Sequence, residues 1–169
     1  MQLDEVKNLI DSAAGKVSPA SLLVEGVTES SGIYIWYELG SILPSYIGKA
    51  TGKYGLRNRI LRQHLNPKYL EVRQERWTSE DKTQSIHGVM HNGRLAIEKS
   101  AFRKNLARKL GHAPGEKNIR FILDRFELRL IPLPTLTSVE IARIESELIP
   151  YYRPQLNRAG LNRGGDLAS

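Results

Sequence analysis

Residues 32–50 read GIYIWYELGSILPSYIGKA, and this stretch decides the fold class. Its first part, Gly32 to Tyr37, is rich in β-branched and aromatic residues, which favour strands. A second short run of the same kind begins at Tyr46, and the residues between the two runs are typical of a turn. The stretch therefore predicts a β-hairpin.

Helical patterns lie on both sides of this hairpin. Apolar residues recur at helical spacing within residues 3–13, and a connector containing Gly, Ser and Pro follows up to residue 30. Residues 56–65 show the same period, with arginines between the apolar positions. Pro67 ends that pattern, because the residue before a proline disfavours helix. We expect an N-terminal helix and a basic helix directly after the hairpin.

The second half of the chain predicts an insertion, a further strand and a last helix. Residues 67–118 have the mixed polar composition of loops and short helical pieces, except that residues 97–110 form a strongly basic helical pattern. Residues 119–133 alternate like a strand or a bent pair of strands, and residues 138–152 are helical. The tail, residues 158–169, is expected to be mobile.

Together these patterns predict one α+β domain over residues 1–169. We expect a small antiparallel three-stranded sheet flanked by helices, with residues 67–118 as a helical insertion. No run of about 18 apolar residues occurs, so we expect no membrane span.

Composition points to a polyanionic partner. The chain has 25 Lys and Arg against 18 Asp and Glu residues, a net charge of +7, which suits DNA or RNA. It has no cysteine, which excludes a disulfide framework and cysteine zinc sites. The lack of cysteine also favours a reducing compartment, so we expect a cytoplasmic protein.

Four short motifs carry a family resemblance. In chain order they are Gly32-Ile33-Tyr34, Tyr46-Ile47-Gly48-Lys49-Ala50, Leu56-Arg57-Asn58-Arg59-Ile60, and Glu145 with Pro154 and Asn157. Their order, and the spacing from Glu145 to Asn157, resemble the GIY-YIG nucleases, in style the small stand-alone members of restriction type. The resemblance covers roughly residues 32–66 and 119–157. Asn157 is expected to tie the chain to the site by hydrogen bonds.

The resemblance implies an endonuclease that hydrolyses DNA phosphodiester bonds with Mg²⁺ or Mn²⁺. It implies that Glu145 holds the metal ion, that Tyr34 acts as general base, and that Tyr46 positions the attacking water. Arg59 would contact the scissile phosphate through its planar fork of donors. A phenol has an ordinary pKa near 10, so a neighbouring cation must stabilise the phenolate, and Lys49 is our candidate.

The helix between these motifs departs from the family pattern. Members of the family carry a histidine or tyrosine four residues after the catalytic arginine, whereas Arg59 is followed by Gln63 at that position and by His64 one residue later. On an α-helix, five residues do not bring two side chains to the same face. Either the helix is locally overwound, or Arg59 and His64 do not share a face, in which case Arg57 with His64 is the alternative pair.

Cations on the two basic helices would contact the DNA backbone. The candidates are Arg57, Arg62, Lys99, Arg103, Lys104 and Arg108. An ordinary solvated surface is the alternative for residues 97–110. For the chain as a whole, the alternatives are a nucleic-acid-binding module without turnover, which the shifted His64 favours, and a nicking nuclease of repair or homing type. A two-fold symmetric target would imply a homodimer.

Overall fold

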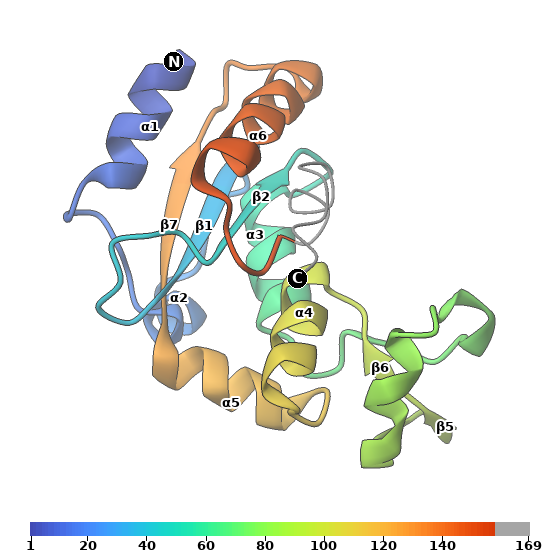
Figure 1. Cartoon of the computed structure of the whole chain (residues 1–169). Coiled ribbons are helices and arrows are strands. Elements are labelled where there is room, and N and C mark those ends of the chain that lie inside the picture. Colours follow the sequence, from blue (N-terminus) through green and yellow to red (C-terminus); the bar gives the residue numbers. More distant parts are fainter. Residues whose placement is uncertain (158–169) are drawn as a thin grey trace.

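A three-stranded antiparallel sheet lies at the centre of the computed structural model, which describes residues 1–157 (Figure 1). Its strands are β1 (Gly32–Glu38), β2 (Tyr46–Ala50) and β7 (Phe126–Pro132), in the order β2-β1-β7. The middle strand β1 pairs with β7 over its whole length and with β2 from Gly32 to Trp36. The predicted hairpin and the α+β class with its small antiparallel sheet are confirmed. The predicted mobile tail lies outside the described residues.

One face of the sheet packs against the first and last helices. Ile33, Ile35 and Tyr37 of β1 share a core with residues of α1 (Leu3–Asp11) and α6 (Ser138–Tyr152). The predicted helix 138–152 is confirmed with the same bounds, and the N-terminal helix ends two residues earlier than expected.

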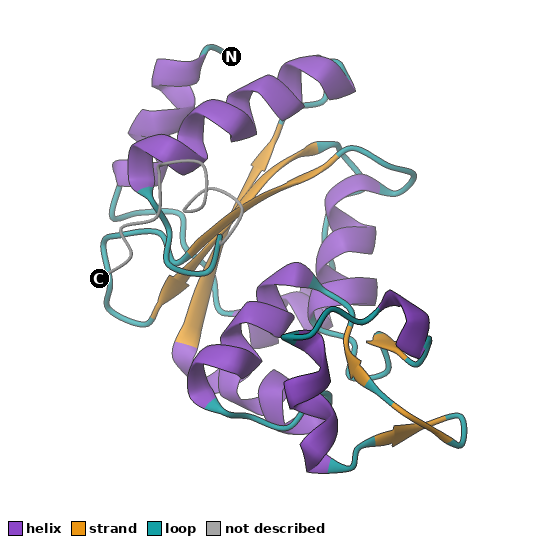
Figure 2. Ribbon diagram, turned by 45° about the vertical axis from the view of Figure 1, so that its right-hand side comes forward, coloured by secondary structure: helices purple, strands orange, loops and turns teal. Residues whose placement is uncertain are grey.

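The other face packs against the remaining helices, so that helices cover both sides of the sheet (Figure 2). Tyr34 and Trp36 point to this side, because successive residues of a strand face opposite ways. Burial on both faces explains why Gly32 to Tyr37 is apolar throughout instead of alternating. The helices on this side are α2 (Pro19–Glu25), α3 (Gly55–Arg57) with its π-helical continuation η1 (Asn58–His64), α4 (Ala101–Leu110) and α5 (Glu116–Arg125).

The predicted insertion contains short elements that lie to one side of the sheet (Figure 1). They are β3 (Leu70–Glu71), η2 (Gln74–Arg76), η3 (Asp81–His87), β4 (Met90–His91), β5 (Arg94–Leu95) and β6 (Ile97–Glu98). β3 pairs with β6 and β4 with β5, both antiparallel. The basic pattern 97–110 therefore begins as a strand, and its helix starts only at Ala101, after Ser100 as N-cap.

Two further expectations about secondary structure were wrong. Residues 119–125 are the end of helix α5 and not a strand, because Ile119 and Ile122, three residues apart, are both buried on one side of a helix. The connector before the hairpin contains the unexpected helix α2, which starts at Pro19, where a proline is well tolerated. Within residues 1–157, no helix is both long and apolar enough to cross a membrane.

Candidate active site

Tyr34 and Tyr46 lie side by side on the face of the sheet that α3 and η1 cover. In the register of β1 and β2, Tyr34 opposes Gly48 and Trp36 opposes Tyr46, so the two tyrosines are diagonal neighbours. Their ring centroids are 6.2 Å apart. A Cβ atom on Gly48 would overlap the Tyr34 hydroxyl, so the glycine makes room for this phenol.

The π-helix η1 resolves the spacing of Arg59 and His64. In a π-helix each backbone N–H bonds to the carbonyl five residues earlier, as Leu65 N does to Ile60 O at 2.9 Å. Side chains five residues apart therefore lie on one side. The helix is underwound and not overwound as one alternative held, because a π-helix has more residues per turn than an α-helix. Arg59 Nη1 donates to Gln63 Oε1 at 2.8 Å, which positions the guanidinium.

The alternative pair of Arg57 with His64 is not formed. The Arg57 side chain is half exposed and makes a 3.0 Å ion pair with Glu29. His64 is buried instead, and its Nε2 lies 2.8 Å from Tyr34 Oη. Its Nδ1 lies 2.7 Å from Ser100 Oγ. His64 therefore connects Tyr34 of β1 with Ser100, the N-cap residue of α4.

Burial sets the protonation of these groups. It lowers the pKa of His64 well below its ordinary value, and the charges of Arg59 and Arg103 lower it further, so the imidazole is neutral at pH 7. Burial raises the pKa of Tyr34 well above its ordinary value; Tyr46 and Glu145 add to this, and Arg59 opposes it. The pKa of Tyr34 is therefore not brought toward neutrality in the protein alone.

Lys49 does not lie where we expected. It opposes Ile33 in the β1–β2 register, so it lies on the face of α6, and its ammonium group makes an ion pair with Glu145. The cation that lowers the pKa of Tyr34 is Arg59. Burial raises the pKa of Tyr46 to about 12; the charge of Glu145 also raises it, while Tyr34 and Arg59 lower it. The Glu145 carboxylate therefore acts on both tyrosines, although helix α6 lies on the opposite side of the sheet. It can do so because β2 is an edge strand.

Asn157 completes the edge of β2. Its Nδ2 donates to Ile47 O at 2.7 Å, and its Oδ1 accepts from Ile47 N at 2.7 Å. Ile47 lies between Tyr46 and Gly48, so the amide holds the backbone that carries both residues. Asn157 therefore ties the chain after α6 to β2 by hydrogen bonds, as expected.

The side chain of Arg103, on the basic helix α4, points into the protein. The expected phosphate contact of Arg103 is therefore wrong. The Arg103 side chain has 0% exposure and makes a 2.6 Å ion pair with Glu98, also 0% exposed. Its Nη1 donates to the carbonyls of Gln63 and Asn66 at 2.7 and 2.6 Å. DNA cannot reach a guanidinium in this position, because the side chain is fully buried and already paired with Glu98.

Two further cations of α4 are already paired. Lys104 makes a 3.3 Å ion pair with the buried Asp81, and Arg108 pairs with Asp81 and, at 3.2 Å, with Glu80. The backbone of η3 carries Asp81, so these pairs hold two parts of the insertion together. The surface that α4 presents is therefore far less positive than its sequence indicates.

The remaining expected DNA contacts stay on the surface. Arg62 is exposed, with its Cζ 5.1 Å from the centroid of the Tyr54 ring, and Lys99 is exposed, with its Nζ 5.1 Å from that of Tyr69. Both cations keep their charge available to a phosphate. Arg57, Arg62 and Lys99 thus remain predictions for DNA contact.

The sequence interpretation missed Ser100. A serine before a helical run is a typical N-cap, and that signal was available in the sequence. The helix was instead expected to start at Ile97, which hid the cap. Its contact with His64 joins positions 36 residues apart and has no local signature.

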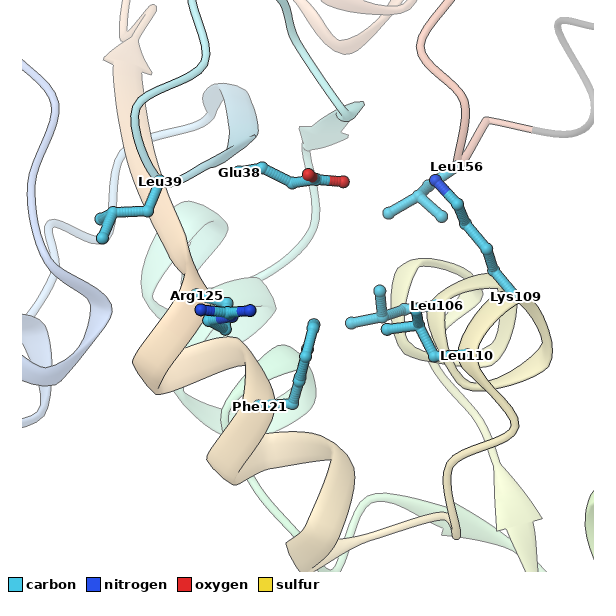
Figure 3. A pocket seen from close by; sticks show the side chains of 8 residues that line it. All are labelled: Glu38, Leu39, Leu106, Lys109, Leu110, Phe121, Arg125 and Leu156. Carbon is cyan, nitrogen blue, oxygen red and sulfur yellow. The ribbon is translucent and has the colours of Figure 1, made fainter.

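A hollow of about 380 Å³ is lined by other residues (Figure 3). It opens between Leu106 and Leu110 of α4, Phe121 and Arg125 of α5, and Glu38 at the end of β1. None of the predicted catalytic residues lines it, so its size does not locate the chemistry.

No protein-family model, curated protein or solved structure matches the chain. The arrangement of its own residues is therefore what supports a function.

Proposed function

We propose that the protein is a DNA endonuclease that hydrolyses phosphodiester bonds with Mg²⁺ or Mn²⁺. The supporting observation is that four side chains converge on one face of the sheet: Tyr34, Tyr46, Arg59 and His64. The carboxylate of Glu145, on α6, acts on both phenols beside the edge strand β2. These residues come from separate segments of the chain, and each has a type that phosphodiester hydrolysis requires. The resemblance to the GIY-YIG nucleases implies the same reaction.

Hydrolysis needs a base for water and positive charge for the phosphoryl oxygens. In the proposed step, Tyr34 as phenolate takes a proton from the water, and the water oxygen forms a bond to phosphorus. The P–O3′ bond breaks, and the 3′ oxygen leaves as an alkoxide that takes a proton from solvent. Tyr46 Oη holds that water in place, and the guanidinium of Arg59 pairs with the phosphoryl oxygens. Asn157 keeps Tyr46 in position through the backbone of Ile47.

Glu145 would hold the metal ion. It is a single carboxylate, and residues 1–157 contain no group of three or more His, Cys, Asp or Glu that could hold a metal ion. Such a donor set fits Mg²⁺, which keeps several waters and takes one or two carboxylates together with substrate phosphate. Bound there, the ion would stabilise charge on the phosphoryl and leaving oxygens. Lys49 balances the carboxylate in the protein alone.

A plasmid-cleavage assay with matched carboxylate variants tests this function. We expect wild-type protein with Mg²⁺ or Mn²⁺ to cut supercoiled plasmid, and Glu145→Gln to reduce the rate by a factor on the order of 10³ while duplex binding at low salt persists. Glu147→Gln is the matched control, because Glu147 lies on the same helix and pairs only at the surface with Arg143. Binding without cleavage by the wild type would refute the proposal. Discrete fragments would support the restriction type, and a smear or nicks alone would not.

A nucleic-acid-binding module without turnover is the second candidate. The raised pKa of Tyr34 favours it, because a phenol that stays protonated cannot take a proton from water. The pH dependence separates the two candidates. If Tyr34 is the base, the cleavage rate should rise about tenfold per pH unit from about pH 7 to about pH 10, since the phenolate fraction grows by that factor below the pKa. Tyr34→Phe should remove this rise, and a flat wild-type profile would exclude Tyr34 as base.

A further inference from the structure

The insertion reaches the candidate active site through one side chain. Ser100 caps helix α4, is 5% exposed, and places its Oγ 2.7 Å from His64 Nδ1. On the other side of the imidazole, Nε2 lies 2.8 Å from Tyr34 Oη. The three side chains form a continuous hydrogen-bonded row from the insertion to the sheet.

Counting hydrogens gives this row a direction. Ser100 Oγ already accepts from the backbone N–H of Arg103 at 3.3 Å, which is the N-cap bond. The hydroxyl has one hydrogen to donate, and within residues 1–157 the acceptor it meets is His64 Nδ1. If Nδ1 carried the hydrogen instead, Ser100 Oγ would accept twice and its own buried hydrogen would have no acceptor. A buried unpaired donor is costly, so the first arrangement is favoured.

The direction determines which nitrogen of His64 carries hydrogen. The ring is neutral, because burial and the charges of Arg59 and Arg103 lower the pKa of His64. A neutral imidazole with Nδ1 as acceptor carries its hydrogen on Nε2. That hydrogen points at Tyr34 Oη, and a hydrogen bond received by the phenol oxygen favours the phenolate form.

We infer that Ser100 is a positioning residue that fixes His64 as its Nε2–H tautomer, so that His64 donates a hydrogen bond to Tyr34 Oη. The catalytic consequence rests on the proposed function; the tautomer itself does not. Segment 67–118 then contributes a side chain to the candidate active site.

The surroundings of Ser100 make it a rigid support. Arg103, one turn into α4, donates to the carbonyls of Gln63 and Asn66, which flank His64 on both sides. Its buried partner Glu98 lies two residues before Ser100 and also accepts from Gly115 N at 2.8 Å. The cap of α4 and the end of η1, which carries His64, are therefore tied together by Arg103 and its buried partner.

Nitrogen-15 NMR of histidine-labelled protein tests the tautomer without reference to activity. We expect the His64 ring to show the Nε2–H pattern in the wild type, with its signals identified among the four histidines by their loss in His64→Gln. A wild-type spectrum with the hydrogen on Nδ1 would overturn the inference. This result stands whether or not the protein cuts DNA, so it separates failure of the inference from failure of the proposed function.

Variants of Ser100 test the catalytic consequence. Ser100→Ala should give a mixture of His64 tautomers and lower kcat by about 10- to 100-fold with little change in KM, the loss seen when partners that orient a histidine are removed. Ser100→Thr keeps a hydroxyl and a good cap, so it should restore both the Nε2–H pattern and kcat. Thr137→Ala, which removes the cap of α6, controls for a loss of stability alone. An unchanged tautomer and kcat in Ser100→Ala would contradict the inference.

Discussion

Two arginine-bearing helices, residues 55–64 and 101–110, look alike in sequence but use their cations in different ways. In the first, the Arg57 side chain is 52% exposed and pairs only at the surface, with Glu29. In the second, the Arg103 side chain has no exposure and serves as an internal support. Both helices were expected to contact DNA. The first keeps Arg57 and Arg62 exposed, whereas α4 keeps only Lys109 exposed among its four cations.

The acids near each helix account for the difference. Glu98, Glu80 and Asp81 all belong to the insertion, and they pair with three of the four cations of α4, namely Arg103, Lys104 and Arg108. The first helix has Glu29 as its ion-pair partner, and Arg59 instead faces the two tyrosines and His64. A basic run therefore indicates a binding surface only when no buried acid lies against it in the folded chain.

Removing Arg59 should sharpen this contrast most. We expect Arg59→Ala to lower the cleavage rate about 10³-fold, because it removes the charge that faces the phosphoryl oxygens. The folded state should be nearly unaffected, since within residues 1–157 the hydrogen bond of the Arg59 side chain is to Gln63 in its own helix. Initial rates on plasmid measure the effect. Arg57→Ala is the control, and an equal loss in that variant would mean that the two arginines act as one general DNA contact.

Removing Arg103 should lower the stability of the fold and should not act on the cleavage step itself. We expect Arg103→Met to lower the free energy of unfolding by about 3–5 kcal/mol, because Glu98 is left as a buried charge without its partner. Denaturant titration measures this loss. The double variant Arg103→Met with Glu98→Leu should recover part of it. A single variant with wild-type stability would show that Arg103 is not internal.

His64, the last residue of the first helix, should make stability depend on pH. The pKa of His64 is below 6.5 in the folded state, so between that folded pKa and 6.5 the unfolded chain binds more protons. The contribution of His64 to the free energy of unfolding is complete above about pH 6.5. It falls by up to about 1.4 kcal/mol per pH unit as the pH drops below that value. Unfolding at pH 7, 6 and 5 measures the slope. His64→Gln should flatten it, and an unchanged slope would assign the effect to other groups.

Salt dependence of DNA binding should show the smallest effect. Arg62→Ala should reduce the slope of log affinity against log salt by about one, because one phosphate contact is lost. Lys104→Ala should leave the slope unchanged, because Asp81 already holds that cation. Duplex binding at several salt concentrations measures both. A slope reduced equally in both variants would mean that DNA displaces the Asp81 pair.

Local patterns in the sequence determined much of this protein. The β-branched and aromatic run 32–37 predicts a buried strand, the turn after it predicts the hairpin, and the apolar period over 138–152 predicts the last helix. These features depend on neighbours in the chain. Tyr34 and Tyr46 could be expected to meet because a hairpin joins their strands.

The rest was decided by the tertiary structure. The pairs Lys49 with Glu145 and Ser100 with His64 join residues 96 and 36 positions apart, so no local period reveals them. The burial of Arg103 depends on Glu98 arriving from β6. Charge and hydroxyl chemistry are visible in a sequence, but whether a group faces a partner, solvent or a substrate is determined only when distant segments pack together.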